Sequence, residues 1–215
     1  MKDPQGGTQT SATTGRLQAV CWDMGGVLLR TFNWTGRRSW ERRLGLRPGA
    51  LELRVFDGEV GRLAMLGRAT ADDVWEDLAH AFGLTDEERR SLRSDFFAGD
   101  RLDDVLLGYV ASLRPARRTA LISNAWPGIR HVLGAAASQA VFDELIVSSE
   151  VGVAKPDPLI YQIAFDRLRL GPEAVVFVDD MTRNLEAARA VGMRPVMFNG
   201  TQRTIEAVER LLDRS

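Results

Sequence analysis

The sequence predicts an α/β protein in which a doubly wound parallel sheet of five strands carries an inserted group of helices. Two observations predict this architecture. Short apolar runs of strand length recur along the chain, and stretches with helical periodicity separate them. Between the first and the second run, about ninety residues show helical patterns only. The length of 215 residues suits one domain with a modest insertion.

The expected strands are apolar and rich in β-branched residues, which is typical of buried parallel strands. They cover residues 17–22, 118–123, 144–148, 174–178 and 194–198. Two helices between them are recognisable. Residues 158–168 place Ile160 and Ala164 on one face, and an apolar stripe that starts at Leu185 ends at Gly192, a typical C-terminal cap. This alternation predicts a Rossmann-like core.

The patterns after the first strand predict an all-helical cap of four helices. Three cover residues 34–44, 50–56 and 71–82, with Thr70 suited to cap the third, and the fourth begins at the capping box of Thr85 and Glu88. We expect a disordered tail at residues 1–16, the core at 17–30 and 105–215, and the cap at 31–104. Because open α/β sheets bind ligands at the carboxyl ends of their strands, this cap would cover the site.

The composition excludes several classes of protein. Twenty-eight cationic residues face 29 anionic ones, a balance that argues against nucleic-acid binding, which needs a basic excess. No apolar run is long enough to span a membrane, and the first 16 residues lack the apolar region of a signal peptide. The single cysteine, Cys21, excludes an internal disulfide bond. We therefore expect a cytoplasmic protein.

Side chains that could take part in catalysis or ligand binding follow four of the expected strands. They are Asp23 after the first, Ser123 and Asn124 at the end of the second, Lys155 after the third, and Asp179, Asp180 and Asn184 after the fourth. If the sheet is parallel, they converge at one edge. Lysine is rare here, because only Lys2 and Lys155 are lysines and the other 26 cationic residues are arginines. This bias indicates that position 155 needs an ammonium group.

This set of groups suits phosphoryl chemistry. An aspartate at a strand end can act as a nucleophile, but its attack on a phosphoryl group must overcome the repulsion between two anions. An ammonium group and a divalent cation offset that repulsion. Magnesium (Mg²⁺) prefers oxygen ligands, so two carboxylates and a backbone carbonyl could hold it. Gly25 and Gly26 let the backbone approach a ligand closely.

Four motifs carry a resemblance to a known family. D-x-G-G-V-L begins at Asp23, S-N at Ser123, G-x-x-K-P-D-P at Gly152 and F-V-D-D-x-x-x-N at Phe177. In this order the set resembles the haloacid dehalogenase-like (HAD) superfamily, in members with a helical cap after the first motif. Within it, the chain is similar to the branch with sugar-phosphate phosphatases and the N-terminal domain of soluble epoxide hydrolases.

The resemblance implies a role for each matching residue. Asp23 would be the nucleophile and a Mg²⁺ ligand, the Gly25 carbonyl and Asp180 would complete the metal site, and Asp179 would support Asp180 or Lys155. Ser123 and the Asn124 backbone would bind the transferring group. Lys155 would pair with Asp23 and the phosphoryl oxygens, and Asn184 would contact metal-bound water or Lys155.

One position departs from the family pattern. Most phosphatases of this superfamily carry a second aspartate two residues after the nucleophile, as general acid and base, and here that position is Gly25. Losing such a group typically costs about 10²–10⁴ in rate. The departure indicates a slow enzyme, a substrate with a good leaving group, or a substitute acid from the cap, for which Asp57 and Glu59 are candidates.

Three functions follow from this pattern. The first is a Mg²⁺-dependent phosphatase that acts on a small phosphorylated metabolite through an aspartyl-phosphate. The second is a metal-independent 2-haloacid dehalogenase that uses the same Asp23. The third is a weakly catalytic regulatory protein that binds a phosphorylated ligand. In each case we expect a monomer or homodimer with no nucleic-acid or membrane partner.

Overall fold

The computed structural model of the chain describes residues 16–134 and 140–213, so the predicted disordered tail lies outside the described residues except for Arg16. A parallel sheet contains five strands in the order β5-β4-β1-β6-β7. Their bounds are β1 Ala19–Trp22, β4 Arg118–Ser123, β5 Glu144–Val147, β6 Val175–Asp179 and β7 Arg194–Met197. The chain winds from the central β1 to one edge and then to the other. The predicted doubly wound fold is therefore confirmed, with strand bounds within about two residues of those expected.

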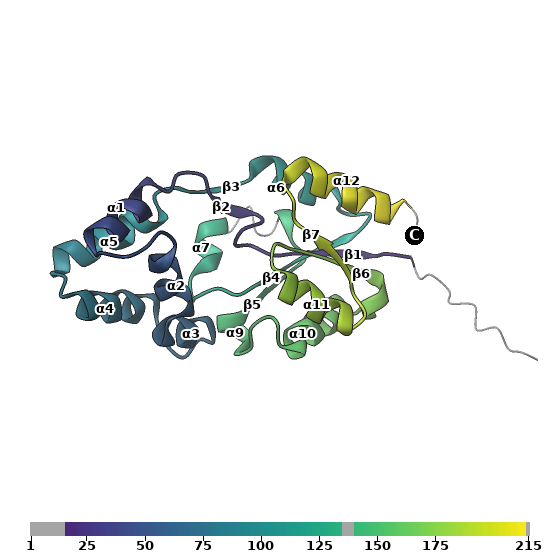
Figure 1. The fold of residues 1–215 in the computed structure, drawn as a ribbon. Coiled ribbons are helices and arrows are strands. Elements are labelled where there is room, and N and C mark those ends of the chain that lie inside the picture. Colours follow the sequence, from purple (N-terminus) through teal and green to yellow (C-terminus); the bar gives the residue numbers. More distant parts are fainter. Residues whose placement is uncertain (1–15, 135–139, 214–215) are drawn as a thin grey trace, which may run out of the picture.

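The two faces of the sheet are covered by different helices (Figure 1). On one face, α6 (Asp104–Ser112) and α12 (Thr201–Leu212) pack on Val20 and Trp22. On the other face, α10 (Pro158–Leu168) and α11 (Thr182–Ala190) pack on Ala19 and Cys21. Successive side chains of a strand point to opposite faces, so both kinds of position must be apolar. This explains why β1 is a continuous apolar run. The shorter elements α7 (Ile129–Leu133), α9 (Ser148–Val151) and η1 (Pro172–Ala174) also belong to this part of the chain.

Five helices form a separate group beside the sheet, which we name the helical segment (Figure 1). They are α1 Thr35–Arg43, α2 Ala50–Asp57, α3 Glu59–Met65, α4 Ala71–Phe82 and α5 Asp86–Phe97. The predicted N-cap Thr70 opens α4, where it also forms a capping box with Asp73, and the predicted capping box of Thr85 with Glu88 opens α5. The segment has its own hydrophobic core around Trp75. Each helix therefore buries its apolar face against the others and not against the sheet.

The prediction that this region contains helices only is wrong, because two short antiparallel strands enclose it. β2 (Leu29–Thr31) leads into the helical segment and β3 (Asp100–Leu102) leads out of it. Side chains join them as well, since the Thr31 hydroxyl donates to Asp100. Three-residue strands with mixed polar and apolar side chains have no usable periodicity, so the sequence pattern did not reveal them. The helix α3 was missed too, because its seven residues are too few for a clear helical periodicity.

Trp126 joins the loop after β4 to the helical segment. Its indole nitrogen donates to the Gly61 carbonyl oxygen at 3.1 Å. Its ring lies 5.3 Å from that of Phe56 and 6.2 Å from that of Trp75, measured between centroids. Trp126 thus packs against the core of the helical segment, although it comes from the sheet portion of the chain.

We expect Trp126→Ala to lower the free energy of unfolding by about 3 kcal/mol, because it removes a large aromatic group from this packing. Trp126→Phe keeps a ring and loses the hydrogen bond, so its expected cost is smaller, about 1 kcal/mol. Urea unfolding of both variants measures the difference. Equal stability of Trp126→Ala and the wild type would show that the contact between loop and helical segment does not contribute to stability.

Across the described parts of the chain, no helix combines the length and the apolar character needed to cross a membrane.

Candidate active site

Three neighbouring strands bring their carboxyl ends together in the middle of the sheet. Asp23 directly follows β1, Ser123 ends β4 and Asp179 ends β6. The strands on both sides of β1 pair with it in parallel, and the Asp23 amide continues the ladder by donating to the Val178 carbonyl oxygen at 2.9 Å. The fold therefore places these three side chains at one edge.

Lys155 lies between two carboxylates. Its ammonium nitrogen is 2.7 Å from an Asp23 oxygen and 2.7 Å from an Asp179 oxygen. The Lys155 side chain is 1% exposed and that of Asp179 is fully buried, so water does not screen these contacts. A buried ion pair of this kind is costly to break, because the remaining charge has no partner.

The loop that carries Lys155 is fixed by Asn124. The Asn124 carboxamide donates to the Lys155 carbonyl oxygen at 2.8 Å and accepts from the Lys155 amide at 2.7 Å. The residue after Ser123 therefore holds the lysine backbone in place. The proposed binding of a substrate by the Asn124 backbone stays a prediction.

Three residues donate hydrogen bonds to the Asp179 carboxylate, and Lys155 is one of them. The Met181 amide donates to it at 2.8 Å, and the Asn184 carboxamide donates to both of its oxygens at 3.0 Å. Asn184 is thus in direct contact with Asp179. These hydrogen bonds fix the orientation of the buried Asp179 carboxylate.

The acidic side chains of Asp23, Asp179 and Asp180 form a group that could hold a metal ion. One oxygen of each lies within 4.8 Å of those of the other two. The donor set consists of carboxylate oxygens, which suits Mg²⁺. The Asn184 side-chain oxygen is buried and has no hydrogen-bond partner among the described residues, so an acceptor near this group is left for a metal-bound water. The residues present therefore fit a hydrated divalent cation.

Gly26 makes room for this group. Its φ of +78° lies in the left-handed region that favours glycine. A Cβ atom at Gly26 would lie 2.0 Å from an Asp180 oxygen. The second glycine of the motif is thus needed for the position of Asp180. At Gly25, by contrast, an added Cβ atom would meet nothing within 4 Å.

Burial shifts the acidity of two of these carboxyl groups. It raises the pKa of Asp23 to about 7, a shift that the Lys155 charge opposes and the Asp179 charge increases. Burial also raises the pKa of Asp180, and the Asp179 charge adds to this rise. Burial first, and the nearby Asp179 charge second, therefore make Asp23 reluctant to ionise.

The structure brings Asp23, Lys155 and Asp179 into direct contact and places Asp180 beside Asp23 and Asp179. Ser123 is 2% exposed at the same edge, and its role in binding the transferring group stays a prediction. The Gly25 carbonyl as a metal ligand also stays a prediction.

Sequence reasoning missed Ser148, which supports the site from the first residue of α9. Its hydroxyl accepts from the Ala125 amide at 3.0 Å and donates to the Ala125 carbonyl oxygen at 3.3 Å. Ser148 therefore anchors the loop that follows Ser123 and Asn124. It lies outside the four motifs, and a serine at the end of an apolar run carries no signal of such a contact.

Comparison with known proteins places this geometry in context. The chain is 28% identical to bifunctional epoxide hydrolase 2 of Sus scrofa over 91% of its own length and 39% of that protein. It therefore spans about two fifths of the first curated relatives it matches. It is also 28% identical to phosphatase MT3486 of Mycobacterium tuberculosis, over 90% of this chain and 93% of that protein. A shorter match, 34% identical over 43% of this chain and 42% of that protein, is to (S)-2-haloacid dehalogenase 1 of Pseudomonas sp..

A similar solved structure is a HAD family enzyme of Bacteroides thetaiotaomicron in complex with magnesium and inorganic phosphate. It has a TM-score of 0.71 and 17% identity, and the match covers 85% of this chain and 94% of that one. At this identity the likeness concerns the fold. The model of the haloacid dehalogenase-like hydrolase family matches residues 17–192, which include Asp23, Ser123, Lys155 and Asp180. The chain therefore belongs to the haloacid dehalogenase-like hydrolase family.

Proposed function

We propose that this hydrolase is a Mg²⁺-dependent phosphatase that removes phosphate from a small phosphorylated metabolite. The observation that carries the proposal is the group of three carboxylates around a buried ammonium. Lys155 supplies one positive charge against three carboxylates, and a divalent cation would compensate the negative charge that remains. The phosphatase relative that matches over nearly its whole length supports the same function.

In the proposed mechanism, an Asp23 oxygen attacks phosphorus while the bond from phosphorus to the leaving oxygen breaks. Lys155, held at 2.7 Å from Asp23, would orient the nucleophile and stabilise the negative charge on the phosphoryl oxygens. Ser123 would bind another phosphoryl oxygen. Asp23, Asp180 and the Gly25 carbonyl would hold Mg²⁺, with Asp179 as support, and the cation would neutralise charge at the site. Water then attacks phosphorus, the bond from phosphorus to the Asp23 oxygen breaks, and inorganic phosphate leaves with the Asp23 carboxylate restored.

We further propose that the helical segment acts as a cap over this edge of the sheet. Trp126, three residues after Ser123, already contacts the core of the segment, so the segment reaches the loop that borders the site. A cover of this kind excludes bulk water during phosphoryl transfer. It would also select substrates by size and shape.

The test is phosphate release from a panel of phosphorylated metabolites, measured with Mg²⁺ and with a chelator. We expect turnover of at least one compound with Mg²⁺ only, and background rates for Asp23→Asn. Equal rates for the wild type and Asp23→Asn, or turnover that the chelator leaves unchanged, would contradict the proposal.

The second candidate function is a 2-haloacid dehalogenase, which the absence of an acid at Gly25 favours because dehalogenation needs no proton for its leaving group. Halide release from chloroacetate in the presence of a chelator distinguishes the two reactions. The third function, binding of a phosphorylated ligand with little catalysis, would appear as tight binding of a panel compound without phosphate release.

The raised pKa of Asp23 gives a prediction about pH. Because its folded pKa of about 7 lies above the ordinary value of 3.8, a proton on Asp23 stabilises the cation-free fold at low pH, and this contribution is lost as pH rises through 7. A cation must displace that proton. We therefore expect millimolar Mg²⁺ to raise the melting temperature more at about pH 8 than at about pH 5.5.

Thermal melts of the wild type and Asp23→Asn with and without Mg²⁺ check this prediction. The asparagine cannot titrate, so the variant should lose most of the pH dependence. If Mg²⁺ raised the melting temperature of the wild type more at the lower pH, the result would contradict the prediction.

A further inference from the structure

A basic pocket lies at the edge of the sheet opposite the candidate active site. It has a volume of about 450 Å³, within the range of small-molecule sites. Its position follows from the strands, because Gln18 directly precedes β1 and Arg118 begins β4. Asp23 and Ser123 lie at the other ends of these same strands. The pocket is therefore separate from the proposed catalytic machinery.

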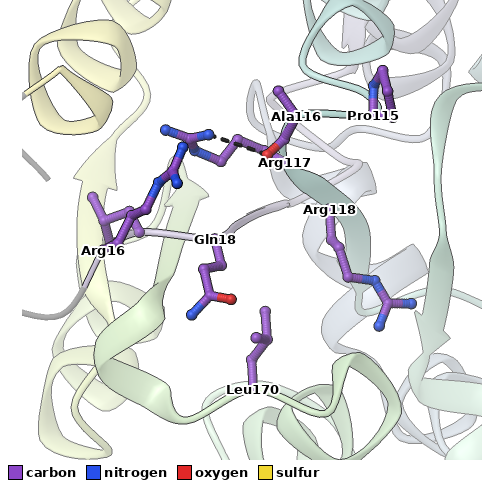
Figure 2. A pocket seen from close by; sticks show the side chains of 8 residues that line it. Arg16, Gln18, Pro115, Ala116, Arg117, Arg118 and Leu170 are labelled. Carbon is purple, nitrogen blue, oxygen red and sulfur yellow. Dashed lines mark hydrogen bonds between the residues drawn. The ribbon is translucent and has the colours of Figure 1, made fainter.

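The lining of this pocket is cationic. Arg16, Arg117 and Arg118 contribute guanidinium groups, and no acidic residue is among the described residues that line it. In Figure 2 the side chains of Arg16 and Arg117 point toward one another, and that of Arg118 lies across the pocket from them. Like charges that converge without an acid between them repel each other, and an anion would relieve that repulsion.

Arg117 has an unused donor. Its Nη1 atom donates to the Ala116 carbonyl oxygen at 3.1 Å, but its buried Nε atom has no hydrogen-bond partner within the described part of the chain. Buried donors without partners are rare in folded proteins. Arg118 is more fully engaged, since it donates to the Leu168 carbonyl oxygen at 2.7 Å and lies 4.0 Å from a Glu144 oxygen. Arg16 and Arg117 are thus the side chains available to a ligand.

We propose that this pocket binds the phosphate group of a small anionic molecule, as a second site distinct from the catalytic one. Guanidinium groups pair with phosphate oxygens through two parallel hydrogen bonds. Donors that approach from different sides suit a tetrahedral phosphate better than a planar carboxylate, which offers two oxygens in one plane. The Gln18 carboxamide and Leu170 would contact the rest of the molecule.

The test is isothermal titration of the metal-free protein with pyrophosphate, since without a cation the acidic active site repels anions. We expect Arg117→Gln and Arg16→Gln each to weaken binding about tenfold or more. Arg90→Gln is the matched control, because Arg90 is exposed on α5 far from the pocket in sequence and fold. Ser123→Ala, at the catalytic edge, should leave the affinity unchanged.

The proposal would be overturned by no binding of pyrophosphate to the wild type, by equal affinities for Arg117→Gln, Arg16→Gln and Arg90→Gln, or by loss of binding in Ser123→Ala. Citrate provides the comparison between anion classes, and citrate bound as tightly as pyrophosphate would overturn the assignment to phosphate. Arg16 is exposed, so its substitution remains informative if Arg117→Gln folds poorly.

Discussion

Lys155→Arg is expected to lower the rate of phosphate release at least about 100-fold, although it conserves the charge. The ammonium nitrogen lies 2.7 Å from both Asp23 and Asp179 in a fully buried position. A guanidinium group is planar and larger, so it cannot place one nitrogen between the two carboxylates without moving them. Displacement of the Asp23 nucleophile by about 1 Å is enough to cost such a factor. The measurement is kcat with Mg²⁺ on the best substrate of the panel.

Two further variants separate catalysis from folding. Lys2→Arg makes the same exchange at the only other lysine and should behave as the wild type. Lys155→Met removes the charge, leaves two buried carboxylates without their cationic partner, and should cost about 3–5 kcal/mol of stability in urea unfolding. Near-normal kcat in a folded Lys155→Arg variant would show that the site does not require the ammonium.

Gly25→Asp is expected to raise the rate by about 10²–10⁴, because it supplies the general acid and base that the family pattern has at this position. The structure accepts the change, since a Cβ atom at Gly25 would meet no atom within 4 Å and its φ lies outside the left-handed region. The gain should be larger for alkyl phosphates than for p-nitrophenyl phosphate, whose leaving group needs no proton. Rates on both substrates test this.

Two other substitutions, Gly25→Asn and Gly26→Ala, provide the controls. Gly25→Asn has nearly the same shape but cannot transfer a proton, so it should not accelerate the reaction. Gly26→Ala should reduce activity, because its Cβ atom would collide with the Asp180 carboxylate and its φ is +78°. If Gly25→Asp and Gly25→Asn had equal rates, the missing acid would not be what limits this enzyme.

The sequence predicted the features that recur along the chain or that belong to short sequence motifs. The five strands were recognisable because both faces of the sheet are covered, which makes each strand a continuous apolar run. The convergence of Asp23, Lys155 and Asp179 followed from parallel strands that end at one edge. Two helix starts in the helical segment were predictable, one from the N-cap residue Thr70 and one from the capping box of Thr85 with Glu88, because caps are local in sequence.

Contacts that depend on three-dimensional packing were not predictable in this way. The pairing of Leu29 with Leu102 joins residues distant in sequence through three-residue strands without a pattern. Ser148 supports Ala125 because the end of β5 lies beside the loop after β4, and nothing local in the sequence marks this neighbour. The same holds for the convergence of Arg16 with Arg117, which lie at the starts of two strands that only the sheet brings together.

The β2–β3 pair has a mechanical consequence. The two connections between the sheet and the helical segment, β2 and β3, are hydrogen-bonded to each other, so they move as one two-stranded ribbon and not as two independent linkers. A two-stranded ribbon resists twisting and sideways sliding and permits bending in one direction. We therefore expect the helical segment to rotate about a single axis, and we expect the Trp126 contact to break first. Substrate would then enter and product would leave on the Trp126 side.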